Sequence, residues 1–240
     1  MSDLLTGVLR VGIKLLLRVA KESVMRLQML LAIISALALA ACASGPTPPD
    51  WQASVLSATE RATEAYLTGR ARIEQVEFAR ARTEIARTGN AELIGRVELI
   101  RCATRVTSLV LEDCEGFDKL AADAGPADRA YAQYLAGRST PTEAALLPVA
   151  HRDVIKGGAA AAQAIANPFS RIVACGVLFK MSLADPAVIA LAINTASAQG
   201  WNRPLLAWLS VQHRRAELAG DSAQAARIKR RIDLVLQPPS

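Results

Sequence analysis

From residue 50 to the C-terminus, apolar residues recur at spacings of three and four, and glycine or proline interrupts the pattern repeatedly. Residues with this spacing lie on one face of a helix, so the pattern is typical of amphipathic α-helices. The predicted helices cover 50–68, 70–88, 91–108, 117–124, 126–136, a short alanine-rich stretch before 167–168, 172–183, 186–200, 203–219 and 221–236. Strand signals are missing. We therefore predict an all-α fold, a bundle of antiparallel helices in a single domain over 50–240.

The predicted helix over 70–88 has a narrow apolar side, which we expect to face the core. Its large apolar residues are Ile73, Val76, Phe78 and Ile85. Charged residues cover the rest of the helix: Glu74, Glu77, Arg80, Arg82, Glu84 and Arg87. Because the carboxylates stand beside arginines on a polar face, we interpret pairs such as Glu74 and Glu77 as solvated ion pairs and not as catalytic acids.

The last fifty residues resemble a tetratricopeptide-type helical hairpin. The resemblance rests on Leu191, Ala198, Trp201, Leu205, Trp208 and Leu209, followed by the small-residue turn 216–221. It covers one or two helices, and no period of about 34 residues occurs elsewhere, so it implies packed antiparallel helix pairs only. A bundle with ordinary short turns is the alternative. Trp201 and Trp208 lie on one side of a helix, and we expect them in the core; an exposed aromatic anchor for a partner is the sharper alternative.

The formal charge of the chain is +6, and half of it lies in the first 41 residues. That segment holds five basic and two acidic side chains, which leaves 23 basic and 20 acidic side chains in the rest. A domain with a net charge of +3 is only mildly basic, so we expect no nucleic-acid partner.

Residues 25–42 combine a basic start, a short apolar run and small residues before a cysteine. This order is typical of a secretory signal peptide, and the run is shorter than the roughly 20 residues of a membrane-spanning helix. Its last four residues, Leu39-Ala40-Ala41-Cys42, resemble the lipobox of bacterial lipoproteins. The resemblance implies that the signal peptide 25–41 is removed and that Cys42 becomes an acylated N-terminus. An ordinary signal peptide or an uncleaved anchor is the alternative.

Residues 42–49 predict a lipidated tether, because their small residues and prolines cannot form a helix. Each buried acyl methylene contributes about 0.8 kcal/mol, so two or three chains hold a domain at a membrane durably. In lipoproteins of this type an aspartate after the cysteine favours the inner membrane. Ala43 occupies that position here. The resemblance therefore implies a lipid-anchored protein of the cell outer membrane that faces the periplasm, with the inner membrane as the alternative.

Residues 1–24 precede a signal peptide that is complete from Met25. Arg10, Lys14 and Arg18 recur every four residues, as in a basic amphipathic surface helix. We interpret the segment as a mis-assigned translation start, and an extended basic region before the signal peptide is the alternative.

Three further cysteines would enter an oxidising compartment if the chain is exported. Cys102 lies late in the predicted helix 91–108, and Cys114 lies in the break after it. If the helix ends near Ser108, the chain can fold back and bring the two α-carbons within the roughly 4.4–6.8 Å of a disulfide. We predict this disulfide; a helix that continued to Leu111 would prevent it. Cys175 stands in an apolar run and is expected to be a buried thiol, with a link to one of the other two as the alternative.

The sequence indicates no catalytic, metal or cofactor site. Its two histidines, His151 and His213, lie in separate predicted helices, and neither Cys-x-x-Cys nor His-Glu-x-x-His occurs. Gly157-Gly158 lacks the spacing of a phosphate-binding loop, so we interpret it as a helix boundary.

Two basic clusters are candidates for contact with anionic lipid headgroups, lipopolysaccharide or cell-wall polymers. The main cluster comprises Arg227, Lys229, Arg230 and Arg231, and the second comprises Arg80, Arg82 and Arg87. A solvated helix face is the alternative for both. Our leading hypothesis is a membrane-anchored, non-enzymatic module that binds a protein or an anionic envelope component. A cell-wall-acting enzyme and a passive structural component of the envelope are the alternatives.

Overall fold

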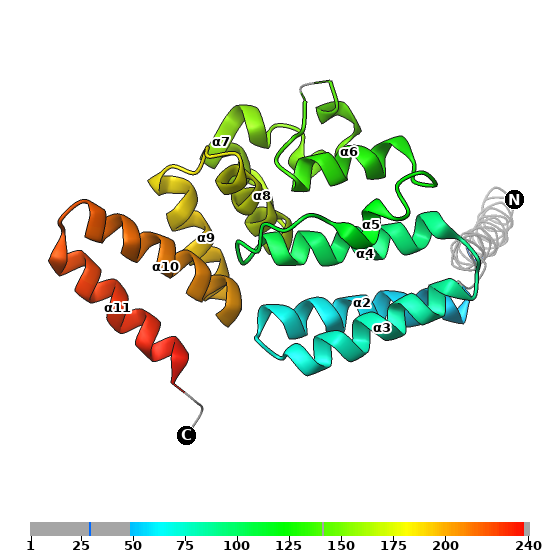
Figure 1. Cartoon of the computed structure of the whole chain (residues 1–240), viewed down its shortest axis with the longest axis horizontal. Helices are drawn as coiled ribbons and strands as arrows, with labels where there is room; N and C mark the ends of the chain where they lie inside the picture. The colour runs from blue at the N-terminus through cyan, green and yellow to red at the C-terminus, as the bar shows by residue number, and fades with distance from the viewer. Residues whose placement is uncertain (1–28, 30–48, 141, 238–240) are drawn as a thin grey trace, which may run out of the picture. The chain divides into compact units, whose positions relative to one another are not determined.

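The computed structural model describes residue 29, residues 49–140 and residues 142–237, and its regular elements there are all helices (Figure 1). The predicted all-α class is confirmed. The lipobox-like motif with Cys42 and the segment 1–24 lie outside the described residues. Among the helices that are described, none is long and apolar enough to cross a bilayer. Asp50–Ser240 form one compact unit.

The helices are α2 (Asp50–Leu67), α3 (Ala71–Ala86), α4 (Ala91–Val106), α5 (Glu115–Asp118), α6 (Pro126–Leu135), α7 (Val154–Ala164), α8 (Pro168–Lys180), α9 (Pro186–Gln199), α10 (Asn202–Leu218) and α11 (Ser222–Leu236). Two 3₁₀ turns, η1 (Ala144–Leu146) and η2 (Val149–His151), lie between α6 and α7. Four helices begin after a side chain that accepts a hydrogen bond from the backbone amide three residues later: Asn90, Asn167, Asp185 and Asp221. Local capping chemistry therefore sets these boundaries.

Three predicted boundaries were wrong. Helix α5 covers Glu115–Asp118 and not the predicted 117–124, because the chain forms turns after Asp118. Helix α8 begins at Pro168, before the predicted start at Ile172, because Asn167 caps it and proline suits the first helical turn. Gly157 and Gly158 lie inside α7, where Gly158 adopts φ 55° and ψ −134° and kinks the helix. Such a left-handed φ is accessible to glycine at little cost.

Helix α4 connects two of the three hydrophobic clusters of the domain. Val97 packs with Phe78 and Ile85 of α3 in one cluster, whereas Leu99 packs with Tyr134 of α6 in another. The third cluster lies mainly among α7–α11. Helix α8 approaches α4 closely at Gly176, where a Cβ atom would overlap the backbone carbonyl of Val106. The close approach therefore depends on a residue without a side chain.

The apolar side predicted for α3 was partly wrong. Phe78 and Ile85 are buried, but Ile73 and Val76 are 44% and 61% exposed. The buried residues are Glu74, Phe78, Ala81 and Ile85, whose spacings of four, three and four form one stripe. Because Glu74 is buried, it is not the solvated carboxylate that we predicted. Its Oε1 lies 3.4 Å from Nε of Arg101 on α4.

The two tryptophans are core residues, as predicted, and the alternative of an exposed anchor is wrong. Trp201 and Trp208 are both buried. The indole N–H of Trp208 donates to the carbonyl oxygen of Thr107 at 2.9 Å, and that of Trp201 donates to Glu64 at 3.2 Å. Helices α10 and α11 run in opposite directions and pack against each other (Figure 1), which is the local arrangement that the resemblance to a helical hairpin implied.

Candidate functional site

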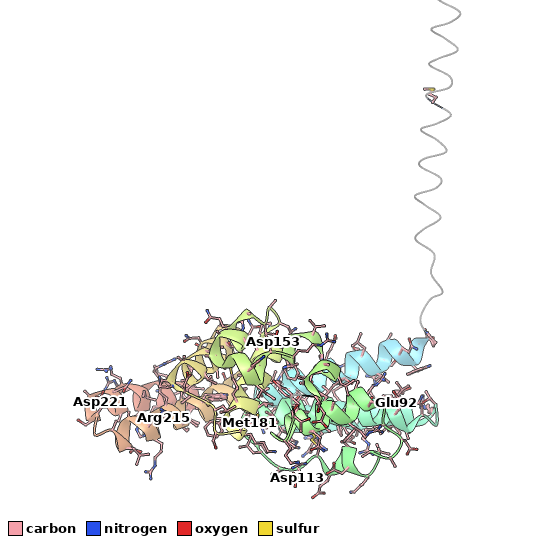
Figure 2. All side chains as sticks on the ribbon, turned by 90° about the horizontal axis from the view of Figure 1, so that it is seen from above. Glu92, Asp113, Asp153, Met181, Arg215 and Asp221 are labelled. Atoms are coloured by element: carbon pink, nitrogen blue, oxygen red, sulfur yellow. A yellow bond between two sulfur atoms is a disulfide. The ribbon has the colours of Figure 1, made fainter. Side chains whose placement is uncertain are left out.

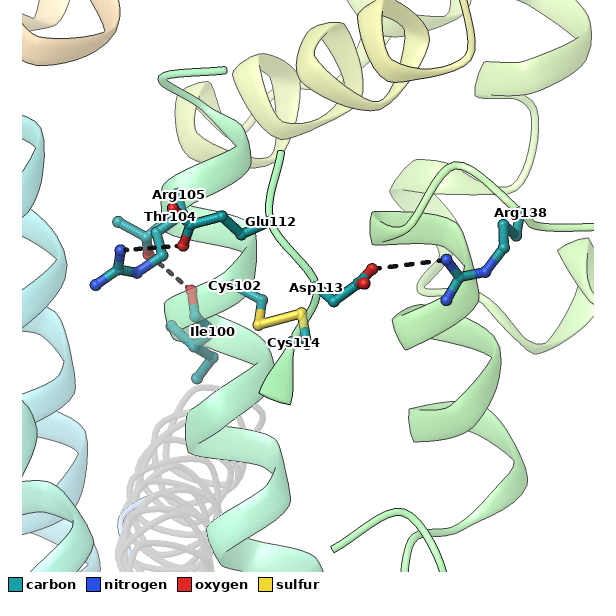
Figure 3. The surroundings of a disulfide bond; sticks show 8 residues. All are labelled: Ile100, Cys102, Thr104, Arg105, Glu112, Asp113, Cys114 and Arg138. Atoms are coloured by element: carbon teal, nitrogen blue, oxygen red, sulfur yellow. Dashed lines mark hydrogen bonds and ion pairs between the residues drawn. A yellow bond between two sulfur atoms is a disulfide. The ribbon is translucent and has the colours of Figure 1, made fainter. Parts of the chain in front are cut away.

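The chain reverses direction after α4 and carries Cys114 back to Cys102. Helix α4 ends at Val106, and Leu109 adopts a left-handed φ of 58°. The α-carbons of Cys102 and Cys114 are 5.8 Å apart, and a disulfide joins them (Figure 3). The alternative in which the helix continued to Leu111 is therefore excluded, and the structure contains the predicted cysteine pair.

The turn after α4 is also held by one hydrogen bond from α10 and by two within the turn itself. Trp208 donates to the carbonyl of Thr107, and the Thr107 hydroxyl donates to the carbonyl of Thr104 at 2.6 Å. The amide of Val110 donates to the carbonyl of Arg105 at 3.2 Å. These bonds fix the direction of the returning segment independently of the disulfide.

A cleft of about 600 Å³ opens beside the disulfide. Its charged lining includes Arg82 from α3, Arg101 and Arg105 from α4, Glu112 from the returning segment, Glu115 from α5 and Lys119 from the turn after α5. The volume falls within the roughly 300–1,000 Å³ that is usual for small-molecule sites. The cleft is the candidate functional site of the described chain.

The floor of the cleft contains a buried ion pair. Glu98 is 3% exposed and pairs with Arg82. A Cβ atom at Gly116 would overlap the Glu98 carboxylate, so a larger residue there would force the Glu98 side chain to move. Because removal of either partner would leave a buried or half-buried charge without compensation, we interpret this pair as structural.

The two arginines of α4 are held differently. The guanidinium of Arg101 lies 4.3 Å from the centre of the Phe78 ring and also faces Glu74. Arg105 stands 5.9 Å above the Tyr66 ring, and its terminal nitrogen is 4.0 Å from the carboxylate of Glu112. Glu112 and Asp113 point to opposite sides of the segment, and Asp113 pairs with Arg138 at 3.7 Å (Figure 3).

The histidines and the free cysteine lie outside this cleft. His151 is buried, and its Nδ1 lies 3.1 Å from the Tyr134 hydroxyl. Burial lowers the pKa of His151 to about 4, so the ring is neutral near pH 7. His213 on α10 lies 3.6 Å from Glu217. Cys175 is the buried thiol that was predicted, and burial raises its pKa to about 12. Within 49–140 and 142–237, no group of three or more His, Cys, Asp or Glu side chains is placed to hold a metal ion.

The main basic cluster divides into two parts on α11. Ala225 and Ile228 face the core, Arg230 lies on the opposite side of the helix, and Arg227 and Arg231 lie next to it on one flank; all three arginines are exposed. Three described arginines thus share one face, and none has an acidic partner within 4.0 Å among the described residues. Lys229 lies on the other flank of α11 and pairs with Asp233.

The second basic cluster is largely neutralised. Arg82 pairs with Glu98, and Arg87 pairs with Glu84 at 2.9 Å. Arg80 is exposed. We therefore retain only the α11 face as an anionic-surface candidate, and it lies apart from the disulfide: Asp221, which caps α11, and Asp113 occupy different regions of the domain (Figure 2).

Sequence reasoning missed the cleft, although one signal for it was present. Glu98, Arg101, Cys102 and Arg105 have spacings of three, one and three, which place charged residues and a cysteine on one stripe of α4. Only the fold shows that the returning segment covers this stripe incompletely. No family model, curated protein or solved structure matches the chain, so the site is described from its own geometry.

Proposed function

We propose that this chain is a bacterial lipoprotein, anchored by acyl chains on Cys42 at the periplasmic face of the outer membrane, whose helical domain is a non-enzymatic binding module. The motif Leu39-Ala40-Ala41-Cys42, which follows an apolar run and precedes a proline-rich tether, carries the proposal. Two or three acyl chains on one cysteine supply enough apolar area for durable attachment to a bilayer.

The disulfide supports the exported location. Disulfides form and persist in oxidising compartments such as the periplasm, and they are rare in the reducing cytosol. Cys102 and Cys114 face each other at a distance that suits this bond, while Cys175 stays a buried thiol. One disulfide and one buried thiol are therefore consistent with a domain that folds in an oxidising compartment.

The arginine face of α11 supports a binding role at an anionic surface. Arg227, Arg230 and Arg231 project from one side of the helix, and Leu234 on the same side is 66% exposed. Each arginine near an anionic membrane contributes about 1 kcal/mol of attraction, and an adjacent leucine can enter the interface. We assign this face to phosphate-bearing groups of the envelope.

Replacing Cys42 by serine tests the anchor. We expect the Cys42→Ser chain to incorporate no labelled palmitate, to keep its signal peptide uncleaved at residue 42 and to lose acyl-dependent membrane attachment, because serine does not provide the thiol that is acylated. Mass spectrometry of the N-terminus and membrane fractionation measure these outcomes. The Cys102→Ser/Cys114→Ser chain is the matched control and should be acylated normally. Unchanged acylation of Cys42→Ser would contradict the proposal.

Charge reversal tests the α11 face. The chain with Arg227, Arg230 and Arg231 changed to glutamate, purified in neutral detergent, should bind phosphocellulose at low salt at least about 100-fold more weakly than the unaltered protein. The salt concentration at elution and the binding isotherm measure this loss.

The matched control reverses three exposed arginines elsewhere, Arg70, Arg72 and Arg80, and so changes the net charge equally. We expect a clearly smaller loss of phosphocellulose binding for this control, because the phosphate groups would be attracted by the local positive potential of α11 and not by the net charge alone. Equal losses for the two variants would contradict the assignment of the α11 face.

A further inference from the structure

The cleft beside the disulfide has the features of a ligand site that is independent of the membrane anchor. We propose that it binds a small molecule or a peptide end that carries one carboxylate, with Arg101 and Arg105 as the groups that receive it. This inference goes beyond the proposed function, because it names a second binding region, away from α11, and does not require acylation of Cys42.

Arg101 and Arg105 are suited to a shared ligand because they lie four residues apart on one face of α4. Each guanidinium stands over an aromatic ring, Phe78 for Arg101 and Tyr66 for Arg105. Stacking limits the freedom of both side chains before a ligand arrives, which lowers the entropy cost of binding. Arg101 Nε is buried and faces Glu74 at 3.4 Å, so a ligand would meet the rest of this side chain, which is 34% exposed.

Glu112 occupies the position that a ligand carboxylate would take. Its carboxylate is 4.0 Å from Arg105, and its side chain is 74% exposed. A pair that is this long and this exposed contributes little free energy, so a ligand can displace it. A carboxylate that approaches the planar guanidinium directly can form two parallel hydrogen bonds, which are shorter and stronger than the resident contact.

The charge of the lining favours a single carboxylate over a dianion. The lining holds four basic side chains, Arg82, Arg101, Arg105 and Lys119, and four acidic ones, Glu98, Glu112, Asp113 and Glu115, so its formal charge is zero. Displacement of Glu112 by a ligand leaves one positive charge, that of Arg105, without its acidic partner. A monoanion matches that charge, whereas a phosphate dianion would be repelled by the acids around it.

Binding of N-acetyl-alanyl-alanine to the full chain in neutral detergent tests the proposal, with dissociation constants measured by saturation-transfer NMR titration. We expect Arg105→Ala to weaken binding by about tenfold, because one charge-assisted contact is lost. Glu112→Ala should tighten binding by up to about fivefold, because it removes the competing carboxylate. Arg72→Ala, at an exposed position of α3 outside both the cleft and the α11 face, is the matched control and should leave the constant unchanged.

The same titrations distinguish the ligand chemistry. N-acetyl-alanyl-alanine amide lacks the carboxylate and should bind at least about tenfold more weakly than the acid. Inorganic phosphate should also bind more weakly. Each of the following results would overturn the proposal: no saturable binding of the acid, equal binding of acid and amide, tighter binding of phosphate, or no effect of Arg105→Ala. None of these results bears on acylation of Cys42, so failure here is separate from failure of the anchor.

Discussion

Replacing Cys102 and Cys114 together by serine is expected to lower the free energy of unfolding by about 3 kcal/mol. The disulfide joins residues that are 12 apart in sequence, and a cross-link of this length restricts the unfolded chain strongly. The native turn should survive the substitution, because Trp208 and Val110 hold it through hydrogen bonds to Thr107 and Arg105. The loss should therefore come mainly from the greater freedom of the unfolded state.

Urea unfolding of the oxidised protein and of the double variant measures this difference. We expect a lower midpoint for the variant and a slightly larger dependence on urea, because its unfolded state exposes more surface. Reductant should bring the unaltered protein close to the variant and should leave the variant itself unchanged, which serves as the control. Equal free energies of unfolding for the oxidised protein and the variant would show that the bond does not constrain the chain.

The disulfide was predictable from the sequence because its precondition is local. A helix that ends shortly after Cys102 allows the chain to return, and the prediction was made on the condition that the helix ends near Ser108 and does not continue to Leu111. The same reasoning placed most helix boundaries, since residues such as Asn90 and Asp221 act on the amides of the next turn. Features that depend only on contacts within one or two helical turns could thus be predicted from the sequence alone.

The side chains that face the core were harder to predict where a helix exposes large apolar residues and buries small or charged ones. On α3 the sequence offered Ile73 and Val76 as core residues, but the fold buries Ala81 and the charged Glu74. Glu74 tolerates burial only because Arg101 of another helix faces it, and that partner is fixed by tertiary packing. The division of the basic cluster could have been calculated, because a rotation of about 100° per residue places Lys229 on the flank of α11 opposite to that of Arg227 and Arg231.

The cleft could not be predicted from the sequence, because it too depends on tertiary packing. Its arginines come from two helices, and its opposite side comes from the segment that the disulfide holds. Whether Arg105 meets Glu112 or solvent depends on the path of that segment, which Trp208 fixes from a position 101 residues away from Thr107. A contact over such a sequence separation leaves no periodic signal in either segment.

Acidification from pH 7 to pH 4 is expected to lower the free energy of unfolding by about 3 kcal/mol through His151 alone. Burial lowers the pKa of His151 from 6.5 to about 4 in the folded protein. Above pH 6.5 the ring is neutral in both states, so it contributes no pH dependence. Between pH 6.5 and pH 4 the unfolded chain binds a proton that the folded chain does not bind, so stability falls as pH falls. Below pH 4 both states are protonated, and the contribution levels off.

The surroundings of His151 explain why the folded protein resists protonation. The ring is 3% exposed and packs against Tyr131 and Tyr134, and its Nδ1 lies 3.1 Å from the Tyr134 hydroxyl. In the neutral ring Nδ1 can accept that hydrogen bond, whereas a protonated Nδ1 can only donate, so the hydroxyl would have to rotate and act as the acceptor. The buried charge would also lose its hydration, and among the described residues no carboxylate forms an ion pair with His151 to offset that loss.

His151→Asn isolates this contribution, because the asparagine oxygen can accept the Tyr134 hydrogen bond and does not titrate. We expect the free energy of unfolding in urea to differ between the variant and the unaltered protein by a constant amount above pH 7, and to shift by about 3 kcal/mol in favour of the variant by pH 4. His213→Asn, at a half-buried position of α10 beside Glu217, is the matched control and should keep the dependence of the unaltered protein. A parallel pH dependence for His151→Asn would show that other groups govern the acid transition and that the buried imidazole does not.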